Sequence, residues 1–209
     1  MKKILCVLSA FVVFIMSGCS AKPSEAPLFE KYVAEGTKYP VKIVWHTVQD
    51  GIGESETIET ASTYYIASPD KFYMSEDFEG SVYDSLYNNG VFYNMIHEEK
   101  TAFSSALSDE EREVCEEIIG YIPSNPEKWV LTEKGEAQYE GKAYLYETAS
   151  LDDTYFLTVY ADPETNNIEY VSSGQGGAMH KLTELTHSFD LRIFDIPEGY
   201  EVVKMPGSK

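Results

Sequence analysis

The chain has 209 residues, and its 35 Asp and Glu residues against 16 Lys and Arg residues give it a formal net charge of -19. This acidity argues against nucleic acid as a partner, because the phosphate backbone is bound mainly through Lys and Arg. It also argues against an electrostatic grip on anionic lipid headgroups. The length suits one domain of ordinary size.

The N-terminal stretch has the parts of a bacterial export signal. Lys2 and Lys3 supply the positive start, residues 4–16 are apolar, and two small residues precede Cys19. The apolar run is too short to span a bilayer as a retained helix. Small residues followed by a cysteine resemble a lipobox, in which the cysteine receives diacylglycerol. An ordinary signal peptide that happens to contain a cysteine is the alternative.

On the lipobox interpretation, residues 1–18 are a lipoprotein signal peptide, Cys19 is the lipid-attachment residue, and residues 19–28 are a lipidated tether. Loss of the signal moves the formal charge to -21, because it removes two lysines and no acid. The protein is then exported and anchored by lipid to the outer face of the bacterial cell membrane, or to the outer membrane if the host has two. Cys115 is left alone, which excludes an intramolecular disulfide, and its apolar neighbours predict a buried small hydrophobe.

Beyond the tether, short runs rich in Tyr, Val, Ile, Phe and Thr alternate with turn signals, a pattern typical of antiparallel sheets. Strands are predicted at residues 39–48, 55–67, 71–78, 81–87, 91–97, 101–106, 129–138, 142–149, 154–161, 168–173 and 181–194. The turns between them are predicted at residues 50–53, 68–70, 79–80, 88–90, 98–100, 140–141, 152–153 and 162–167. This order predicts a meander of hairpins.

One segment departs from the period of two. Ser108 and Glu111 form a capping box, and the acids that follow Ser108 suit a helix N-terminus. We expect the helix to run to about Gly120, with its glutamates facing water and one apolar stripe. The stripe consists of Val114, Cys115, Ile118 and Ile119.

An apolar-faced helix needs a surface on which to dock, and the sheet is the candidate. Strand 91–97 carries apolar residues on both faces, so both faces need cover. The predicted fold is therefore mainly β with one or two helices (α+β), in which a strongly curved antiparallel sheet forms an incomplete barrel and a helix covers the concave face.

Motifs that carry chemistry are scarce. The sequence contains no Gly-x-Ser-x-Gly elbow, no His-Glu-x-x-His helix, no Cys-x-x-Cys pair and no phosphate-binding loop. Four histidines are candidate ligands: His46, His97, His180 and His187. His180 and His187 are an odd number of residues apart on a predicted strand, so we expect them on opposite faces. His97 and the two glutamates after it fit a solvated turn better than a metal site. The glycine-rich residues 173–177 fit a flexible loop. We expect no enzyme, no metal and no cofactor.

Several local phrases match one family. They are Ser68–Tyr73, Asn89–Tyr93, Glu140–Tyr144, Tyr160–Thr165 followed by Ile168–Tyr170, and Phe194–Tyr200. Together with the order of elements they resemble the lipoprotein-carrier superfamily of the LolA and LppX type. The resemblance covers nearly all of the mature chain. It implies a single half-barrel domain over residues 29–209, with helices across the opening and acyl chains bound inside, and it implies no catalytic residues.

A set of apolar residues alternates toward the expected concave face and would line a ligand cavity there. The set is Trp45, Phe72, Met74, Tyr93, Met95 and Phe103, with Ile118 and Ile119 from the helix. A filled core is the alternative. The first hypothesis is a non-enzymatic envelope lipoprotein that binds a lipid acyl chain. The second is an envelope protein-interaction or regulatory module with a filled core. A hydrolase that uses paired carboxylates ranks last.

Overall fold

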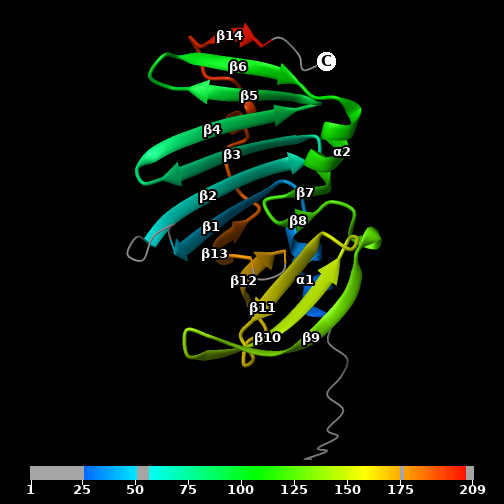
Figure 1. Cartoon of the computed structure of the whole chain (residues 1–209). Coiled ribbons are helices and arrows are strands. Elements are labelled where there is room, and N and C mark those ends of the chain that lie inside the picture. Colours follow the sequence, from blue (N-terminus) through cyan, green and yellow to red (C-terminus); the bar gives the residue numbers. More distant parts are fainter. Residues whose placement is uncertain (1–25, 51–56, 175–176, 206–209) are drawn as a thin grey trace, which may run out of the picture.

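The computed structural model describes residues 26–50, 57–174 and 177–205 (Figure 1). The predicted signal peptide, Cys19 and most of the tether lie outside these residues, and so do parts of the turn at 50–53 and of the loop at 173–177. The long strands are β1 Val41–Asp50, β2 Thr57–Ser68, β3 Lys71–Phe78, β4 Ser81–Asn88, β5 Val91–Ile96, β6 Thr101–Ala106, β9 Val130–Tyr139, β10 Lys142–Ser150, β11 Phe156–Ala161, β12 Ile168–Ser173, β13 Met179–Thr186 and β14 Glu201–Lys204. The remaining elements are helices α1 Leu28–Gly36 and α2 Asp109–Glu117, the short strands β7 Ile118–Ile119 and β8 Ile122–Pro123, and the 3-10 turns η1 Pro126–Lys128 and η2 Leu191–Phe194.

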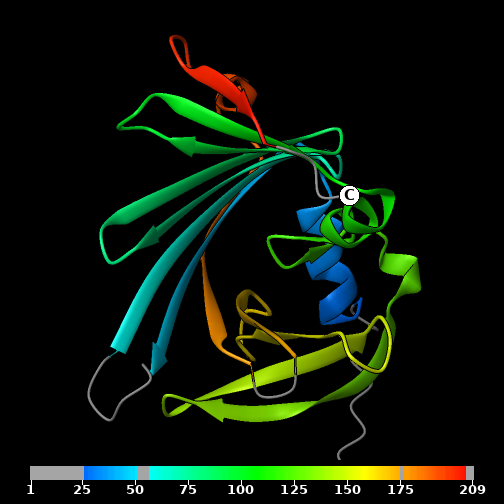
Figure 2. The same ribbon diagram turned by 45° about the horizontal axis from the view of Figure 1, so that its top comes forward.

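The long strands form one 12-stranded sheet in the order β14-β6-β5-β4-β3-β2-β1-β13-β12-β11-β10-β9. All neighbours are antiparallel except β14, which runs parallel to β6. Figure 2 shows that the sheet curves strongly around α1 without closing. The predicted α+β incomplete barrel is confirmed.

Tight turns join several of the hairpins at positions that the sequence marked. Both central residues have positive φ at Glu79-Gly80, Asn89-Gly90 and Glu140-Gly141, with values between 48° and 83°. Two consecutive residues of positive φ are the mark of a type I′ turn, whose twist matches the twist of the strands that it joins. These turns fix the register of the hairpins and therefore decide which residues face inward.

Helix α1 was missed from the sequence, which assigned its start to the tether. Phe29, Tyr32, Val33 and Gly36 are all buried, and their spacing is that of a helical stripe. Nine residues are too few for a stable isolated helix, so α1 depends on its packing inside the curve of the sheet. The side chain of Glu147 on β10 accepts a hydrogen bond from the Phe29 amide at 3.0 Å and so satisfies one of the free N–H groups at the helix start.

Helix α2 has the predicted capping box but ends earlier than predicted. The chain becomes extended at Ile118 and forms the β7–β8 hairpin, so the helix stops at Glu117 rather than near Gly120. Val114 is 63% exposed and does not belong to a buried stripe. Glu117 is buried rather than solvated, because Lys128 pairs with it.

Cys115 is intermediate in exposure between Val114 and Glu117. It is half-buried against the inner core, and burial raises the pKa of its thiol to about 11. Such a thiol is a poor nucleophile at neutral pH. The side chain was predicted to be buried and is half-buried.

Two apolar clusters lie on opposite faces of the sheet. The inner cluster joins α1 and the β7–β8 hairpin to the concave face, and it includes Trp45, Phe72, Tyr87, Leu157 and Val171. The outer cluster is formed by Tyr73, Leu86, Met95, Ala102 and Phe194.

The outer cluster is covered by the segment that follows β13. The predicted strand 181–194 is wrong beyond Thr186, because the chain leaves the sheet there and packs Phe189, Ile193 and Phe194 on its outer face. The chain then adds β14 beside β6, a strand that the sequence did not predict. We call residues 187–200 the outer strap.

Candidate functional site

The strand register sorts the predicted cavity residues onto two faces. Trp45 lies opposite Ser62, which lies opposite Glu76, so Met74 and Phe72 point the same way as Trp45. On β6, Phe103 lies opposite Asn94 and also points inward. Ile119 is buried in the inner cluster, and Ile118 packs against it. Six of the predicted residues therefore share the concave side.

Tyr93 and Met95 point the other way, which corrects the expectation that they face the cavity. They lie opposite Leu86 and Asp84 and belong to the outer cluster beneath the outer strap. Phe92 is the β5 residue that packs against the inner cluster. The sequence did not distinguish the two phases, because β5 is apolar on both faces.

One end of the concave face is filled by the β7–β8 hairpin. The indole of Trp45 donates a hydrogen bond to the Gly120 carbonyl at 2.9 Å, and the Tyr32 hydroxyl donates to the Tyr121 carbonyl at 3.0 Å. The Tyr121 ring stacks on His180 at 4.2 Å between ring centroids. Gly120 has a φ of +56°, and a Cβ there would lie 2.7 Å from Tyr64 Cγ, so the hairpin tip requires glycine. We call the region formed by Trp45, Tyr64, Gly120, Tyr121 and His180 the filled end.

Polar groups at the filled end are matched and uncharged. Thr47 Oγ1 and His180 Nδ1 lie 2.7 Å apart, and burial lowers the pKa of His180, which favours the neutral ring. Burial and the nearby carboxylate of Glu76 raise the pKa of Tyr121 to about 12. The Tyr121 phenol therefore stays protonated at neutral pH.

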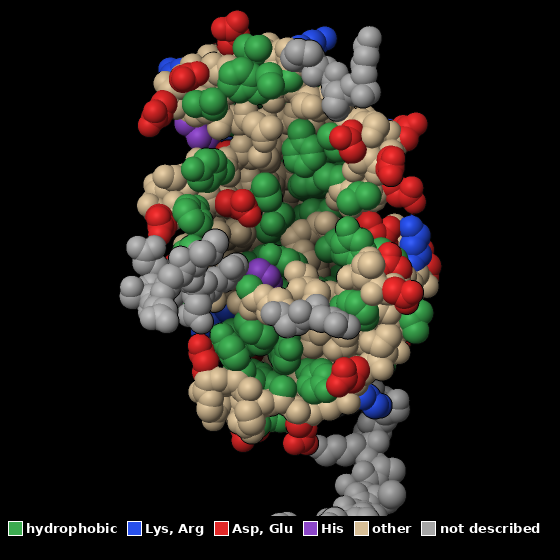
Figure 3. All heavy atoms as spheres, viewed as in Figure 1, with side chains coloured by type: hydrophobic (Ala, Val, Ile, Leu, Met, Phe, Trp, Pro, Cys, Tyr) green, Lys and Arg blue, Asp and Glu red, His purple; other side chains and the backbone are tan. Residues whose placement is uncertain are grey.

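The other end of the concave face remains open. Phe78, Tyr83 and Ile96 point inward by register and are 40%, 59% and 40% exposed. Met74 and Phe103 next to them are half-buried. Figure 3 shows hydrophobic side chains gathered in a hollow on this side of the molecule. We call the inward surface made by these five residues the open end.

The open end is almost free of charge. Along the described inward positions of β3 to β6, Glu76 is the one ionisable carboxylate, and the Ser62 hydroxyl donates to it over 3.4 Å. The other inward polar groups on these strands are hydroxyls and an amide, from Ser81, Ser85, Asn94, Thr101 and Ser105. An apolar surface with few charges can bury an apolar ligand at little cost in desolvation.

Phe78, Tyr83 and Ile96 were not among the predicted cavity residues. The signal for them was present, since Phe78 continues the alternation that Phe72 and Met74 begin on the same strand. Tyr83 and Ile96 follow once the turns at Gly80 and Gly90 fix the pairing of β4 and β5.

The histidine at the β5–β6 turn has partners that the sequence did not reveal. His97 was expected in a solvated charge run, but its Nε2 contacts the Asp84 carboxylate and its Nδ1 contacts the Tyr200 hydroxyl. Asp84 is buried on the outer face, and Tyr200 ends the outer strap. The trio therefore joins the outer strap to the sheet. Among the described residues, no three His, Cys, Asp or Glu side chains are grouped so that they could hold a metal ion.

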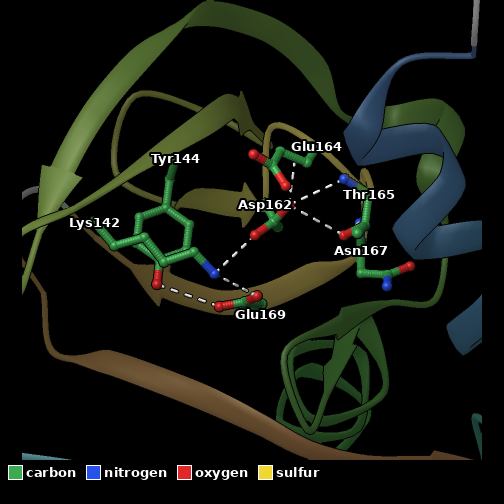
Figure 4. A network of polar contacts seen from close by, with 7 residues as sticks. All are labelled: Lys142, Tyr144, Asp162, Glu164, Thr165, Asn167 and Glu169. Carbon is green, nitrogen blue, oxygen red and sulfur yellow. Dashed lines mark hydrogen bonds and ion pairs between the residues drawn. The ribbon is translucent and has the colours of Figure 1, made fainter.

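A second polar network stabilises the loop between β11 and β12 (Figure 4). Lys142 Nζ lies 2.8 Å from carboxylate oxygens of both Asp162 and Glu169. Asp162 also accepts hydrogen bonds from the amides of Glu164 and Thr165, and Lys142 and these amides hold the pKa of Asp162 well below its usual value. Each polar group here has a structural partner, so the network has a structural role.

None of the helices in the part of the chain that the structure describes is long and apolar enough to cross a membrane. The predicted lipid anchor lies outside that part.

No family model and no curated protein match this chain. Solved structures with a similar fold include an uncharacterized conserved protein from Thermus thermophilus, with 10% identity over 84% of this chain and 99% of that chain and a TM-score of 0.47. A LolA superfamily protein from Nitrosomonas europaea is 6% identical over 80% of this chain and 95% of that one, with a TM-score of 0.36.

A chain of the Pseudomonas aeruginosa MucA/MucB complex is 12% identical over 76% of this chain, with a TM-score of 0.38. This chain spans about half of its length, 55%. At these identities and TM-scores, the likenesses concern the fold and say nothing about a ligand or a partner.

Proposed function

We propose that the protein is a non-enzymatic envelope lipoprotein, anchored through Cys19, that binds a hydrophobic ligand such as a lipid acyl chain at the open end. The observation that supports this function is the contrast in exposure along one apolar surface. Trp45 and Ile119 are buried, whereas Phe78, Tyr83 and Ile96 on the same face are 40% to 59% exposed. Several large inward-facing apolar side chains left in water are a recognised mark of a binding site.

An acyl chain suits this surface chemically. Each buried methylene contributes about 0.8 kcal/mol, so a long chain lying along several strands gains several kcal/mol without any polar contact. The half-buried Met74 offers a flexible, polarizable side chain that adapts to such a ligand. A lipid anchor at Cys19 would keep the domain within reach of membrane lipids.

Photo-crosslinking of the full chain in phosphatidylglycerol nanodiscs tests acyl binding. The probe is palmitic acid that carries a diazirine, and the crosslinked peptides are identified by mass spectrometry. We expect adducts on the inward residues of β3 to β6. Tyr83→Ser should lower the yield, because it removes an inward ring from the open end.

The matched control is Val82→Ser. Val82 precedes Tyr83 on the same strand, is 53% exposed and points to the outer face. It should leave the yield unchanged. Equal yields in both variants, or adducts spread over both faces, would contradict the proposed site.

Anchoring is tested separately by the variant Cys19→Ala. We expect loss of lipid labelling and release of the protein from the membrane fraction, measured by incorporation of a clickable fatty acid and by fractionation. Retention in the membrane at the level of the unsubstituted chain would exclude Cys19 as the anchor.

A protein partner is the second candidate function, as an envelope interaction or regulatory module. The observation that favours it is an acid-lined cavity beside α2, away from the open end.

A further inference from the structure

A small cavity lies where α2, η1 and the loop after β10 meet. Its volume is about 240 Å³. At about 30 Å³ per water molecule, this is room for roughly eight non-hydrogen atoms. It is lined by Glu113, Val114, Glu117, Ile118, Lys128, Leu151, Asp152 and Tyr155. It shares no residue with the open end. Ile118 is the one lining residue that the sequence had predicted for the lipid cavity.

The charge of the lining is negative. Glu113, Glu117 and Asp152 face a single cation, Lys128. Glu117 is only 8% exposed, and its Oε2 receives hydrogen bonds from Lys128 at 2.9 Å and Asn125 at 3.2 Å. Its Oε1 is buried and has no hydrogen-bond partner among the described residues. A buried carboxylate oxygen without a donor is costly, and its negative charge lies next to the cavity.

The helix adds to the negative potential. Glu116 and Glu117 are the last two residues of α2, where the helix dipole is negative and where cations are the favoured residues. The last turn of α2, all of which is described, carries no basic residue. Lys128 supplies part of the compensation from η1, and its pKa is raised chiefly by the hydrogen bond to Glu117.

The rest of the lining is apolar. Ile118 and Leu151 are half-buried, while Val114 and Tyr155 stand at the surface with 63% and 50% exposure. One buried carboxylate and two exposed ones beside apolar side chains match a cation on an aliphatic stem, which can bury its methylenes while its charged end is paired. A bare metal ion fits poorly, since no group of three acidic, His or Cys side chains among the described residues could hold one.

We propose that this cavity binds the side chain of a Lys or Arg presented by a protein partner. Its volume matches one such side chain, its negative lining matches the cation, and the exposed Val114 and Tyr155 would pack against the flanking residues of the partner. A lipid amine is a poorer match, because the phosphate beside it would meet Glu113 and Asp152. A partner with a basic segment would also be drawn to the acidic chain as a whole.

Methyl NMR of the full chain in phosphatidylglycerol nanodiscs tests this assignment, because Val114, Ile118 and Leu151 place methyl groups in the lining. The probe is the peptide acetyl-Leu-Lys-Leu-amide, and the comparison peptide has norleucine in place of lysine. We expect saturable shifts of these three residues with the lysine peptide alone. Added salt should weaken binding of the lysine peptide, since the exposed carboxylates of Glu113 and Asp152 are screened by salt. Equal shifts with the norleucine peptide, or none with either, would overturn the proposal.

Two variants separate binding from folding. Glu117→Gln removes the buried charge and should weaken binding of the lysine peptide about tenfold or more. This is the range for loss of a hydrogen bond to a charged group. Asp152→Asn keeps the oxygen that accepts from the Thr154 and Tyr155 amides and should weaken the peptide by a smaller factor. If both leave the affinity unchanged while the fold is intact, the proposal fails.

The control is Glu110→Gln, which removes one exposed charge from the first turn of α2 and should leave the affinity unchanged. A separate experiment without peptide replaces phosphatidylglycerol by phosphatidylethanolamine in the nanodisc. Shifts of the same methyls there would assign the cavity to a lipid amine and overturn the peptide assignment. Since the acyl-chain experiment probes a different surface, either proposal can fail while the other stands.

Discussion

The two ends of the concave face belong to one sheet but lie on different strands and differ in what covers them. At the filled end, the β7–β8 hairpin places Gly120 and Tyr121 against Trp45 and His180. At the open end, Phe78 on β3, Tyr83 on β4 and Ile96 on β5 remain exposed. Stability and the proposed ligand binding therefore depend on separate stretches of one surface, so each can be changed without the other.

The largest effect is expected at the filled end with Trp45→Ala. Trp45 is completely buried, and its removal leaves a cavity and an unpaired Gly120 carbonyl. We expect a loss of about 3–5 kcal/mol in the free energy of unfolding, the usual range for a buried aromatic residue. Urea unfolding followed by circular dichroism measures it. A loss below about 1 kcal/mol would show that the hairpin does not hold this end.

The hairpin tip gives the next largest effect. In Gly120→Ala, the added Cβ would lie 2.7 Å from Tyr64 Cγ at a φ of +56°. Strain and overpacking together should cost about 1–3 kcal/mol. Gly80→Ala is the comparison, because its φ is +83° but nothing lies within 4 Å of the added atom. The glycine at the filled end should be the more sensitive of the two to thermal unfolding.

The filled end should also make stability depend on pH. Burial lowers the pKa of His180 in the folded state, so below its unfolded value of about 6.5 the unfolded chain binds the proton more readily. The stability contributed by neutral His180 should therefore be complete above about pH 6.5. Below that pH, the free energy of unfolding should fall. His180→Gln should flatten this part of the curve, measured by urea unfolding at several pH values. An unchanged curve would assign the dependence to other groups.

The smallest effect on stability is expected at the open end. Tyr83→Ser changes an exposed side chain and should alter the free energy of unfolding by less than about 0.5 kcal/mol, the same as Val82→Ser. The two variants should then differ only in acyl-chain capture. A large loss of stability in Tyr83→Ser would mean that this ring is part of the core and would remove the distinction between the two ends.

Much of the sheet was predictable because its hairpins are local. Glycine turns such as Asn89-Gly90 and the alternation of apolar residues predicted β2 to β6 and β9 to β12, with bounds close to those observed. The capping box announced α2. The inward placement of Trp45, Phe72, Met74 and Phe103 also followed from alternation.

The errors arose where tertiary contacts decide. Helix α1 is short and stable only through its packing, so its buried stripe was passed over. The face of Tyr93 and Met95 depended on the outer strap, which covers the outer side and lies about 100 residues further along the chain. The burial of Glu117, which was expected to face water, depended on its pairing with Lys128. None of these partners is adjacent in sequence to the residue that it places.

The parallel strand β14 has a consequence for the behaviour of the protein at high concentration. A free edge strand is a template for pairing with another copy, and β14 covers β6 in four residue pairs. The opposite edge, β9, is long and carries Glu133, Lys134 and Glu136 along its exposed length. Charges of this kind discourage edge-to-edge association. One edge of the sheet therefore ends in the short strand β14 while charge protects the other, and a chain truncated after Thr186 should be prone to aggregate through β6.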